Sequence, residues 1–583
     1  MNAPLQGHTA STSSAGTLDT LLQVENVSLE YRTPQRVVRA THEVSFEVDR
    51  ADRFVLLGPS GCGKSTLLKA VAGFIEPVGG SIRLDGAEVR EPGPDRIVVF
   101  QEFDQLPPWK TVKQNVMFPL LASRTLRRRE AEERALHYLE KVGLAAFADA
   151  YPHTLSGGMK ARVAIARALA MQPKILLMDE PFAALDALTR RKMQEELLQL
   201  WEEVRFTLLF VTHSIEEALI VGNRILLLSP HPGRVRAEVG STCTAWVARR
   251  SSRPRSAFIA CCSRKTVRRA RAPLPNWAFT TSASPTEESA IMSLSPARRE
   301  EYEIPLQPLP DLKLERELPL AQRLWQQGWL RKTLILLALA LALALIWELA
   351  ARYQGNDLLL PSFLQTAKAF FEGIGSGELL EKVAISLSVL VKGYLLGIGL
   401  AFLLTTLAVS TQLGRDLLST LTSMFNPLPA IALLPLSLLW FGLGENSLIF
   451  VLVHSVLWAL ALNTYAGFLG VSETQRMAGR NYGLKGLRFV LFLLIPAALP
   501  SILAGLKIGW AFAWRTLIAA ELVFGASSGK GGLGWYIFQN RNELYTDKVF
   551  AGLAAVILIG LLVENLVFAT VERVTVKRWG MQR

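Results

Sequence analysis

The chain has 583 residues, of which 50% are hydrophobic and 19% are charged, and its formal net charge is +13. This length excludes a single domain, and the spacing of the four cysteines excludes a disulfide framework or a tetrahedral metal site. The average composition hides two unlike parts, one with ordinary charge up to about residue 240 and one that is membrane-like from Thr333 onward.

The N-terminal residues 1–21 are rich in Ser, Thr, Ala and Gly and contain no apolar core. They predict a disordered segment without a secretory signal. Residues 22–240 alternate between apolar runs and amphipathic segments, which predicts an α/β domain. We expect this domain to stay in the cytosol.

A phosphate-binding loop follows a buried run of the α/β domain. The sequence GPSGCGKS, Gly58–Ser65, fits the pattern G-x-x-x-x-G-K-S directly after the apolar run 54–57. Glycines let backbone N–H groups turn towards phosphate oxygens, and the helix that begins near Lys64 adds the positive end of its dipole. We expect Lys64 to reach the β- and γ-phosphates and Ser65 to bind Mg²⁺. A chance glycine-rich turn is the alternative, which the preceding strand disfavours.

A second apolar run, residues 175–178, ends in Asp179 and Glu180. The carboxyl ends of parallel strands are where nucleotide chemistry takes place in open α/β sheets. Asp179 suits Mg²⁺, and Glu180 suits the orientation of an attacking water. A solvated strand end is the alternative, but it does not explain why His213 and Gln101 also follow apolar runs.

The sequence LSGGMKARVAIARAL, residues 155–169, lies between the phosphate loop and the acidic pair. This order resembles that of ATP-binding cassette proteins, over residues 22 to about 238. The resemblance implies an α/β P-loop NTPase fold in which residues 156–158 of one copy act on the ATP held by the other copy. It implies that Tyr31 stacks on adenine and that Gln101 senses the γ-phosphate.

The resemblance also makes His213 a switch residue and Asp186 a link between paired sites. The predicted catalytic residues are Glu180, His213 and Gln101, and the predicted Mg²⁺ ligands are Ser65, Gln101 and Asp179. The predicted contacts to ATP are Tyr31, Gly58, Pro59, Ser60, Gly61, Cys62, Gly63, Lys64, Ser65, Thr66, Ser156, Gly157, Gly158 and Asp186.

Met159 stands where the commonest cassette signature has glutamine. The sequences LSGGM, DEPFAALD and VFQEFDQLPPW resemble variants found in importers of nitrate, taurine, alkanesulfonates and related small solutes. Lys160 and Ala161 are less typical of that group. The resemblance therefore implies transport of a small solute and leaves the substrate open.

Six long apolar stretches occupy the part from residue 333 to residue 583. They are residues 334–347, 393–409, 425–443, 448–471, 489–506 extended past Lys507, and 549–574. A bilayer crossing takes about 20 mostly apolar residues, so these stretches predict an all-α membrane domain of about six spans. Pro427, Pro429 and Pro435 break up the third stretch, and broken spans often line a translocation path. Buried helices of a soluble protein are the alternative, which so many successive runs disfavour.

With six crossings and a cytosolic cassette, three basic segments fall on the cytoplasmic side, at residues 323–332, 476–488 and 573–583. This distribution agrees with the positive-inside rule, although Lys530 and Arg541 fall on the outside. We expect a multi-pass protein of the bacterial inner membrane whose basic segments contact lipid headgroups.

The segment MAGRNYGLKGLRFVLFLLIPAALP, residues 477–500, begins on a predicted cytoplasmic turn. It resembles the coupling loop of bacterial importer permeases, in which a short helix docks into a groove on the cassette. Gly483, Pro496 and Pro500 match that pattern, whereas Met477 stands where an acidic residue is usual. Residues 513–535, which contain AWRTLIAAELVFG and GLGW, also resemble this permease family.

Three ionisable residues, His454, Lys507 and Arg515, lie inside or near predicted spans. Such groups are costly in a bilayer, so they invite a role in the path of an anionic substrate. The alternative is structural. Lys507 and Arg515 would then brace the bundle or extend to the membrane surface, and His454 would bond a neighbouring helix.

The predicted linker, residues 241–317, begins with a basic stretch that has no acidic residue before Glu287. It shows no sustained period, which predicts disorder. A basic tract also suits contact with anionic lipid or nucleic acid, although no nucleic-acid partner is expected. Our preferred hypothesis is that residues 241–291 are translated out of frame, because their Arg, Ala, Ser, Pro and Cys content resembles shifted GC-rich DNA. Met292 would then be a natural permease start.

Residues 318–332 predict an amphipathic helix on the inner membrane surface, with an ordinary solvated helix as the alternative. Together the domains predict ATP-driven import of a small solute, such as a sulfonate, taurine or nitrate. The resemblance implies a homodimer that uses ATP and Mg²⁺ and receives substrate from an external solute-binding protein. An exporter, or a cassette ATPase with a signalling or mechanical role, is the alternative.

Overall fold

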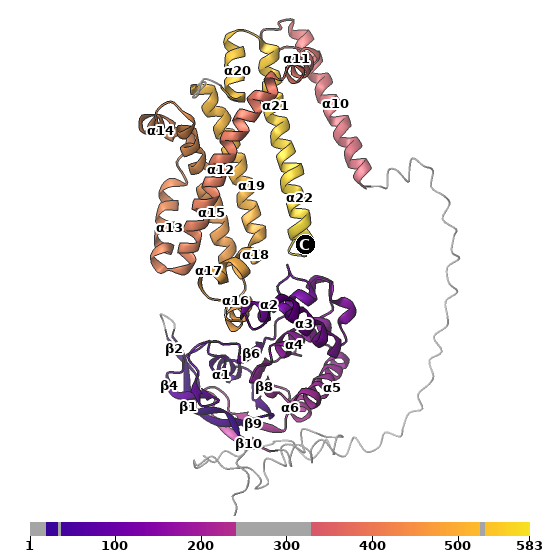
Figure 1. Cartoon of the computed structure of the whole chain (residues 1–583), viewed down its shortest axis with the longest axis vertical. Helices are drawn as coiled ribbons and strands as arrows, with labels where there is room; N and C mark the ends of the chain where they lie inside the picture. The colour runs from indigo at the N-terminus through magenta and orange to yellow at the C-terminus, as the bar shows by residue number, and fades with distance from the viewer. Residues whose placement is uncertain (1–18, 33–35, 241–327, 525–530, 583) are drawn as a thin grey trace, which may run out of the picture. The chain divides into compact units, whose positions relative to one another are not determined.

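The computed structural model describes residues 19–32, 36–240, 328–524 and 531–582 (Figure 1). The predicted linker, 241–317, lies outside the described residues, as do residues 1–18 of the predicted N-terminal segment. The first strand begins at Thr20, before the predicted end of that segment. Residues 318–327 of the predicted surface helix also lie outside, and its last residues, 328–332, open a long apolar helix.

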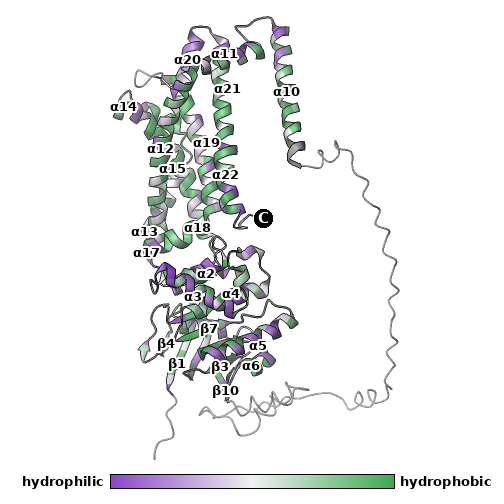
Figure 2. Ribbon diagram, turned by 45° about the vertical axis from the view of Figure 1, so that its right-hand side comes forward, coloured by the Kyte–Doolittle hydropathy of each residue, from purple (hydrophilic) through white to green (hydrophobic). Residues whose placement is uncertain are grey.

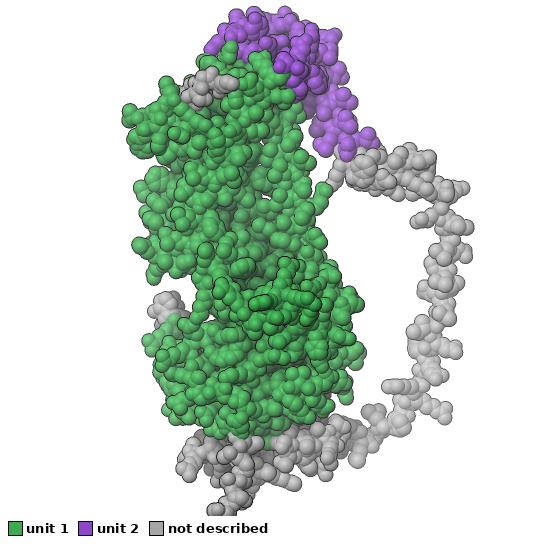
Figure 3. Space-filling model, in the orientation of Figure 1, with its two compact units in different colours: residues 1–270, 377–539, 552–583 green, residues 271–376, 540–551 purple. Residues whose placement is uncertain are grey.

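Hydropathy separates the described residues into two kinds of structure (Figure 2). Hydrophobic residues occupy most of the length of the long C-terminal helices, whereas the elements before residue 240 alternate between polar and apolar faces. By compactness the chain divides into two units, one of residues 1–270, 377–539 and 552–583 and one of residues 271–376 and 540–551 (Figure 3).

The elements before residue 240 form two β-sheets. One is antiparallel with the order β2-β1-β4-β5, and the other has the order β10-β9-β3-β8-β7-β6. In the second sheet five neighbouring strands run parallel, and β10 pairs antiparallel with β9. The strands are β1 (Thr20–Arg32), β2 (Val37–Asp49), β3 (Arg53–Leu57), β4 (Gly79–Leu84), β5 (Ala87–Glu88), β6 (Arg96–Val99), β7 (Ile175–Asp179), β8 (Thr207–Thr212), β9 (Arg224–Leu228) and β10 (Val235–Val239).

Fully buried runs form the centre of the parallel sheet. Every residue of β7, with the sequence ILLMD, and of β8, with the sequence TLLFVT, is buried. Such near-continuous apolar runs are typical of parallel strands that are covered on both faces. The helices of this part are α1 (Lys64–Val71), α2 (Val112–Ala122), α3 (Arg128–Lys141), α4 (Gly157–Ala170), α5 (Ala187–Val204) and α6 (Ile215–Val221). Of these, α1, α4 and α6 contact the parallel sheet, and α2 and α3 pack against each other and against α4. The predicted α/β domain is confirmed.

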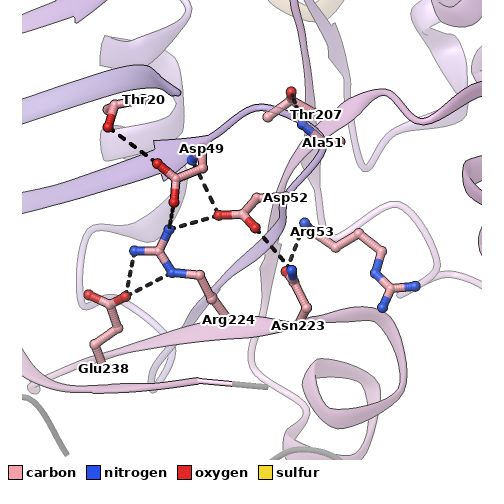
Figure 4. A network of polar contacts seen from close by, with 9 residues as sticks. All are labelled: Thr20, Asp49, Ala51, Asp52, Arg53, Thr207, Asn223, Arg224 and Glu238. Carbon is pink, nitrogen blue, oxygen red and sulfur yellow. Dashed lines mark hydrogen bonds and ion pairs between the residues drawn. The ribbon is translucent and has the colours of Figure 1, made fainter. Parts of the chain in front are cut away.

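A polar network joins the two sheets at the amino ends of the parallel strands (Figure 4). The Arg224 guanidinium donates to Asp52 at 2.7 Å, to Asp49 at 3.2 Å and to Glu238 at 2.6 Å. The Asn223 amide donates to the other oxygen of Asp52 at 2.9 Å. Because the network fixes the amino ends of β3 and β9, the loops at their carboxyl ends extend from a rigid base.

The part from residue 328 onward is mainly helical. Its elements are α10 (Gly328–Gln354), α11 (Phe363–Gly375), α12 (Glu378–Ser410), α13 (Gln412–Phe425), the 3-10 helix η4 (Ala430–Leu433), α14 (Leu434–Phe441), α15 (Glu445–Leu469), α16 (Glu473–Asn481), α17 (Gly486–Phe489), the π-helix η5 (Val490–Leu494), α18 (Ile495–Ala497), α19 (Leu499–Phe524), α20 (Leu533–Asn542), α21 (Thr546–Leu562), the π-helix η6 (Val563–Phe568), α22 (Ala569–Glu572) and the π-helix η7 (Arg573–Lys577). Within this part α15 packs against both α12 and α19.

Of the described residues, five helices are long and apolar enough to cross a membrane. A sixth crossing results if the bent pair, residues 412–425 and 430–441, counts as one span. The break predicted within the third stretch, 425–443, is present, but the half before it is the helix Gln412–Phe425, which begins before the predicted stretch. The chain bends by 88° between the two halves, because Pro427 and Pro429 lack the N–H that would continue the helix. The predicted fifth stretch, 489–506 extended past Lys507, overlaps the long helix α19, which begins at Leu499 and ends at Phe524.

The long C-terminal helices have outward surfaces that water would not tolerate. Only 11% of the most apolar window of residues 546–577 is buried, and only 6% of that of residues 333–354. Their exposed side chains are mostly leucine, isoleucine and valine. Continuous apolar surfaces of this length match the hydrocarbon thickness of a bilayer. These helices therefore form a multi-pass membrane domain.

The three intramembrane ionisable residues have different surroundings. The Lys507 ammonium pairs with Glu572 at 2.6 Å, so it braces α19 against the last membrane helix. The His454 ring packs edge to face against Phe425 and Trp458, with centroid distances of 6.4 and 6.1 Å. The described residues offer neither ring nitrogen a hydrogen bond of normal geometry. Arg515 is exposed on α19, and it forms no ion pair with any residue that the structure describes.

A buried carboxylate fixes the turn after α19. Glu521, which is 3% exposed, accepts hydrogen bonds from Ser386 Oγ at 2.9 Å and from the Gly534 N–H at 2.7 Å. Ser386 Oγ in turn accepts from the Leu533 N–H at 2.8 Å. A Cβ on Gly532 would overlap both the carboxylate and Ser386 Oγ. The glutamate and the glycines of residues 513–535 therefore form one packed unit.

Replacement of Glu521 by alanine is expected to destabilise the membrane domain. It leaves the Gly534 N–H and the Ser386 hydroxyl without their acceptor, and an unsatisfied buried donor costs about 1–3 kcal/mol. A loss of about 2 kcal/mol lowers the melting temperature by about 4–8 °C for a unit of 150–250 residues. Thermal unfolding of the full chain in detergent measures this. The matched control is Asp416→Ala, which removes an exposed carboxylate on α13 and should change the melting temperature little.

Candidate active site

The phosphate loop lies between the buried strand β3 and the start of α1. Gly61 and Gly63 adopt positive φ angles of 78° and 93°, which glycine adopts without strain. A Cβ on Gly63 would also come within 2.7 Å of the Ala40 carbonyl oxygen. The Lys64 ammonium is buried and donates to the carbonyl oxygens of Gly58 and Pro59 at 2.9 Å each. The loop thus forms a tight turn around a cation.

This loop fits the phosphate groups of a nucleotide. No side chain caps the N-terminus of α1, so the backbone N–H groups at the start of this eight-residue helix are not taken by a capping side chain. The charge of Lys64 and these backbone donors both favour an anionic ligand. At the same helix, Thr66 Oγ1 lies 3.1 Å from the hydroxyl of Tyr31, whose ring is 44% exposed. An exposed ring beside the loop suits the base of a nucleotide.

Ser65 and Asp179 lie together, as expected for two residues that share a cation. Ser65 Oγ donates to Asp179 Oδ1 at 2.7 Å, so the start of α1 is bonded to the end of β7. Burial raises the pKa of Asp179, and the hydrogen bond from Ser65 opposes that rise. Mg²⁺ prefers few protein ligands together with phosphate oxygens and water, which this hydroxyl and carboxylate allow.

Glu180 and His213 form the second pair at the carboxyl ends of the strands. His213 Nδ1 lies 2.9 Å from Glu180 Oε2, and the Glu180 side chain is only 16% exposed. Glu180 has a positive φ of 44°, which is uncommon for a residue with a Cβ. The hydrogen bond holds the carboxylate in one orientation, as a general base requires.

The turn that carries His213 is fixed by a buried glutamate. Glu217 is hydrogen-bonded to Thr212 Oγ1 and accepts from the Gln194 amide at 3.1 Å. Thr212 Oγ1 also accepts from the Ser214 N–H at 3.0 Å. These contacts join the end of β8 to α5 and α6. Glu217 and Gln194 therefore position His213 without facing the nucleotide loop themselves.

Gln101, Ser156 and Asp186, the other predicted site residues with functional side chains, lie on elements outside the phosphate loop and the acidic pair. Gln101 is exposed beyond the end of β6, and in the described part of the chain it is not hydrogen-bonded to Ser65 or Asp179. Ser156 caps α4 by accepting from the Met159 N–H at 3.3 Å. The described residues provide no hydrogen bond between this helix start and the phosphate loop. Asp186 caps α5 by accepting from the Thr189 N–H at 3.0 Å.

The short helix α16 docks onto the loop that follows β6 (Figure 1). Thr474 Oγ1 donates to Glu102 Oε2 at 2.7 Å, and the Gln475 amide donates to the Asp104 carbonyl oxygen at 2.9 Å. Glu102 is the residue next to Gln101. The resemblance between residues 477–500 and a coupling loop therefore has a structural counterpart, which begins at Glu473.

Asn481 closes the edge of the parallel sheet. Its amide accepts from the Val98 N–H at 2.8 Å and donates to the carbonyl oxygens of Arg96 and Gly93 at 2.7 and 2.9 Å. Because β6 is the edge strand, the side chain satisfies backbone groups that no further strand pairs with. Asn481 is fully buried, so its bonds fix the position of α16 on the α/β domain.

A buried cation connects α16 to Gln101. Arg167 on α4 is 1% exposed and donates to the main-chain and side-chain oxygens of Gln105 at 2.8 Å each. The Gln105 amide donates to the carbonyl oxygens of Phe100 and Glu102, which flank Gln101. The guanidinium also lies 5.4 Å from the centroid of the Tyr482 ring. A chain of contacts therefore runs from α16 through Arg167 on α4 to the residues on either side of Gln101.

Sequence reasoning missed Arg167, Gln105, Asn481 and Tyr482. A charged residue such as Arg167 in the apolar stretch VAIARALA was the one available signal, because burial of an arginine demands partners. Asn481 and Tyr482 gave no signal of their own, since their partners lie more than 300 residues away in the chain.

Comparison with known proteins identifies both parts of the chain. A family model described as "ABC transporter" matches residues 41–183. A second, described as "Binding-protein-dependent transport system inner membrane component", matches residues 393–576. The two matches fall on the domain with the phosphate loop and on the domain with the membrane helices.

Curated relatives with high identity are ATP-binding proteins. The taurine import ATP-binding protein TauB of Rhizobium johnstonii is 52% identical over 218 residues, which are 37% of this chain and 82% of that protein. The nitrate import ATP-binding protein NrtD of Synechococcus elongatus is 44% identical over 229 residues, 39% of this chain and 83% of that protein. The bicarbonate transport ATP-binding protein CmpD of a Synechocystis species is 43% identical over 236 residues, 40% of this chain and 82% of that protein.

Proposed function

Because the chain belongs to the ABC transporter family and joins an ATP-binding cassette to an inner membrane transport component, we propose that it imports a small anion at the expense of ATP. ATP hydrolysis coupled to transport is the activity of this family. The observation that carries the proposal is the docking of α16, which lies between two membrane helices, onto the loop at Gln101. We take residues 22–240 as the cassette and residues 333–583 as the permease.

The strand ends supply the groups that hydrolysis needs. We assign Lys64 to the charge of the β- and γ-phosphates and Glu180 to the proton of the attacking water. His213 holds Glu180 in place through the bond between Nδ1 and Oε2. Ser65 and Asp179 would hold Mg²⁺, which would supply positive charge beside the phosphate oxygens when bound.

Two copies are needed for a complete site. We propose that Ser156, Gly157 and Gly158 of one copy face the phosphates held by the other copy, and that Asp186 lies near the contact between the copies. ATP drives the change of the membrane helices only if it binds the closed pair of cassettes better than the open pair. Arg167 and Tyr482 provide a route for that closure to reach α16.

The proposed substrate is a small anion such as taurine or another sulfonate, nitrate or bicarbonate. Its support is the identity of the cassette with the taurine, nitrate and bicarbonate proteins. Arg515 adds to it. This exposed guanidinium lies on an otherwise apolar face of α19 with Ile508 and Phe512, and it forms no ion pair with a described residue. A charge there is unsuited to lipid and suited to a polar path.

Uptake by the purified full chain tests the proposal. Proteoliposomes with ATP inside receive a candidate soluble solute-binding protein and labelled taurine, nitrate or bicarbonate on the outside. We expect one of these anions to accumulate only when hydrolysable ATP is inside. Accumulation of a neutral solute alone would overturn the anion assignment. ATP hydrolysis that the binding protein leaves unchanged, with no uptake of any solute, would overturn import itself.

A further inference from the structure

The last membrane helix ends in a glycine cap that lies against the cassette. Gly580 has a φ of 67°, its N–H bonds to the Lys577 carbonyl oxygen at 3.2 Å, and the Met581 N–H bonds to the Val576 carbonyl oxygen at 3.1 Å. These paired bonds are those of a Schellman cap, which requires a left-handed residue at this position. The cap turns residues 578–582, the tail segment, out of the helix axis.

The tail segment contacts two aromatic rings of the cassette. The Arg578 guanidinium lies 5.7 Å from the centroid of the Tyr151 ring, which stacks on His153 at 6.1 Å and 22°. A Cβ on Gly580 would come within 2.5 Å of the His153 ring. Trp579 and Met581 are half-buried and pack against the apolar core of the cassette. The contact thus combines a cation, a close backbone approach and two apolar side chains.

The contacted loop leads directly into the signature helix. Tyr151 and His153 flank Pro152 in a 3-10 turn, and Ser156 follows three residues after His153 as the cap of α4. Residues 148 and 150 also accept hydrogen bonds from the first turn of α2, from Lys113 at 2.8 Å and from Val112 at 2.8 Å. The same helix α2 carries Phe118, whose ring meets Tyr482 edge to face, so α2 connects the loop at Tyr151 to the docked helix α16.

We propose that the tail segment is a second coupling element, which links the last membrane helix to the loop before the signature residues. This inference rests on the proposed transport function. The docked helix α16 contacts the cassette at Glu102, Asp104 and the edge strand. The tail segment instead contacts it at Tyr151 and His153, in the loop before α4. Two separated contacts restrain rotation of the cassette part that carries Ser156, which a single contact does not.

The test compares transport with ATP hydrolysis in the full chain. Arg578→Ala combined with Trp579→Ala should leave ATP hydrolysis without binding protein within about two-fold of the original protein. The number of solute molecules taken up per ATP should fall at least about five-fold. The matched control is Arg573→Ala, which removes an exposed arginine five residues earlier and should leave this ratio unchanged. An unchanged ratio in the tail variants would overturn the inference.

A double-mutant cycle keeps the test independent of general destabilisation. Tyr151→Leu and Arg578→Ala remove the two sides of one contact, so the double variant should lower the uptake-to-ATP ratio no further than the stronger single variant. Independent, multiplicative losses would show that the two residues do not act through each other. The two proposals fail differently, because absence of ATP-dependent uptake by the unsubstituted chain would overturn the transport function instead.

Discussion

Replacement of Glu180 by glutamine is expected to abolish ATP turnover while ATP binding persists. The amide retains the shape of the side chain but cannot accept a proton from water, and removal of a positioned base costs about 100-fold or more in rate. The phosphate loop is untouched by the change, because Lys64 and Ser65 lie on a different strand end. ATP hydrolysis and uptake by proteoliposomes should fall together, and the ATP-bound form should accumulate.

The control for this variant is Glu216→Gln. Glu216 is an exposed carboxylate three residues after His213, so the change in charge is the same and occurs nearby without touching Glu180. Its hydrolysis rate should stay close to that of the original protein. His213→Ala should give an intermediate loss, because Glu180 remains but loses the 2.9 Å bond that orients it. If Glu180→Gln transports solute at the original rate, the assignment of the base is wrong.

The nucleotide loop and the acidic pair were predictable because each follows a buried apolar run. Residues at the carboxyl ends of parallel strands lie at one edge of the sheet. There Glu180 and His213 follow the neighbouring strands β7 and β8 and contact each other. Ser65, in the helix after β3, is bonded to Asp179 on β7 although β8 separates the two strands. The apolar runs predict that these polar residues lie at the carboxyl edge of the sheet, and the sequence gives their chemical types. It does not give the positive φ of Glu180 or the support that Glu217 gives to the His213 turn.

The membrane part was less predictable, because hydropathy reports length and polarity rather than direction. The prolines at 427 and 429 indicated a break, but the 88° bend and the helix Gln412–Phe425 before it depend on packing against α12 and α15. The docking of α16 was identified only by resemblance. Its decisive contacts, such as the amide of Asn481 on the backbone of Val98, join segments that no local pattern relates.

Tyr482→Ala is expected to uncouple ATP hydrolysis from transport. The ring is 1% exposed and lies between the buried guanidinium of Arg167 and the ring of Phe118, at 5.4 and 6.0 Å. Truncation of a buried aromatic side chain costs about 3–5 kcal/mol. About 3 kcal/mol changes the ratio of docked to undocked α16 by about 100-fold. Burial also lowers the pKa of Arg167, and removal of the ring takes away part of what stabilises its charge.

Tyr482→Phe is the control variant, because it removes the hydroxyl and keeps the ring that packs between α16 and the cassette. Among the described residues this hydroxyl has no hydrogen-bond partner, so its removal should leave the ring contacts and the uptake rate unchanged. In Tyr482→Ala the stimulation of ATP hydrolysis by the soluble binding protein should disappear, while basal hydrolysis persists because the strand-end residues are intact. Equal uptake by the alanine and phenylalanine variants would show that α16 transmits closure through Asn481 and Thr474 alone. An alanine variant that loses basal hydrolysis as well would mean that Arg167 supports the catalytic strand ends rather than the connection to the membrane.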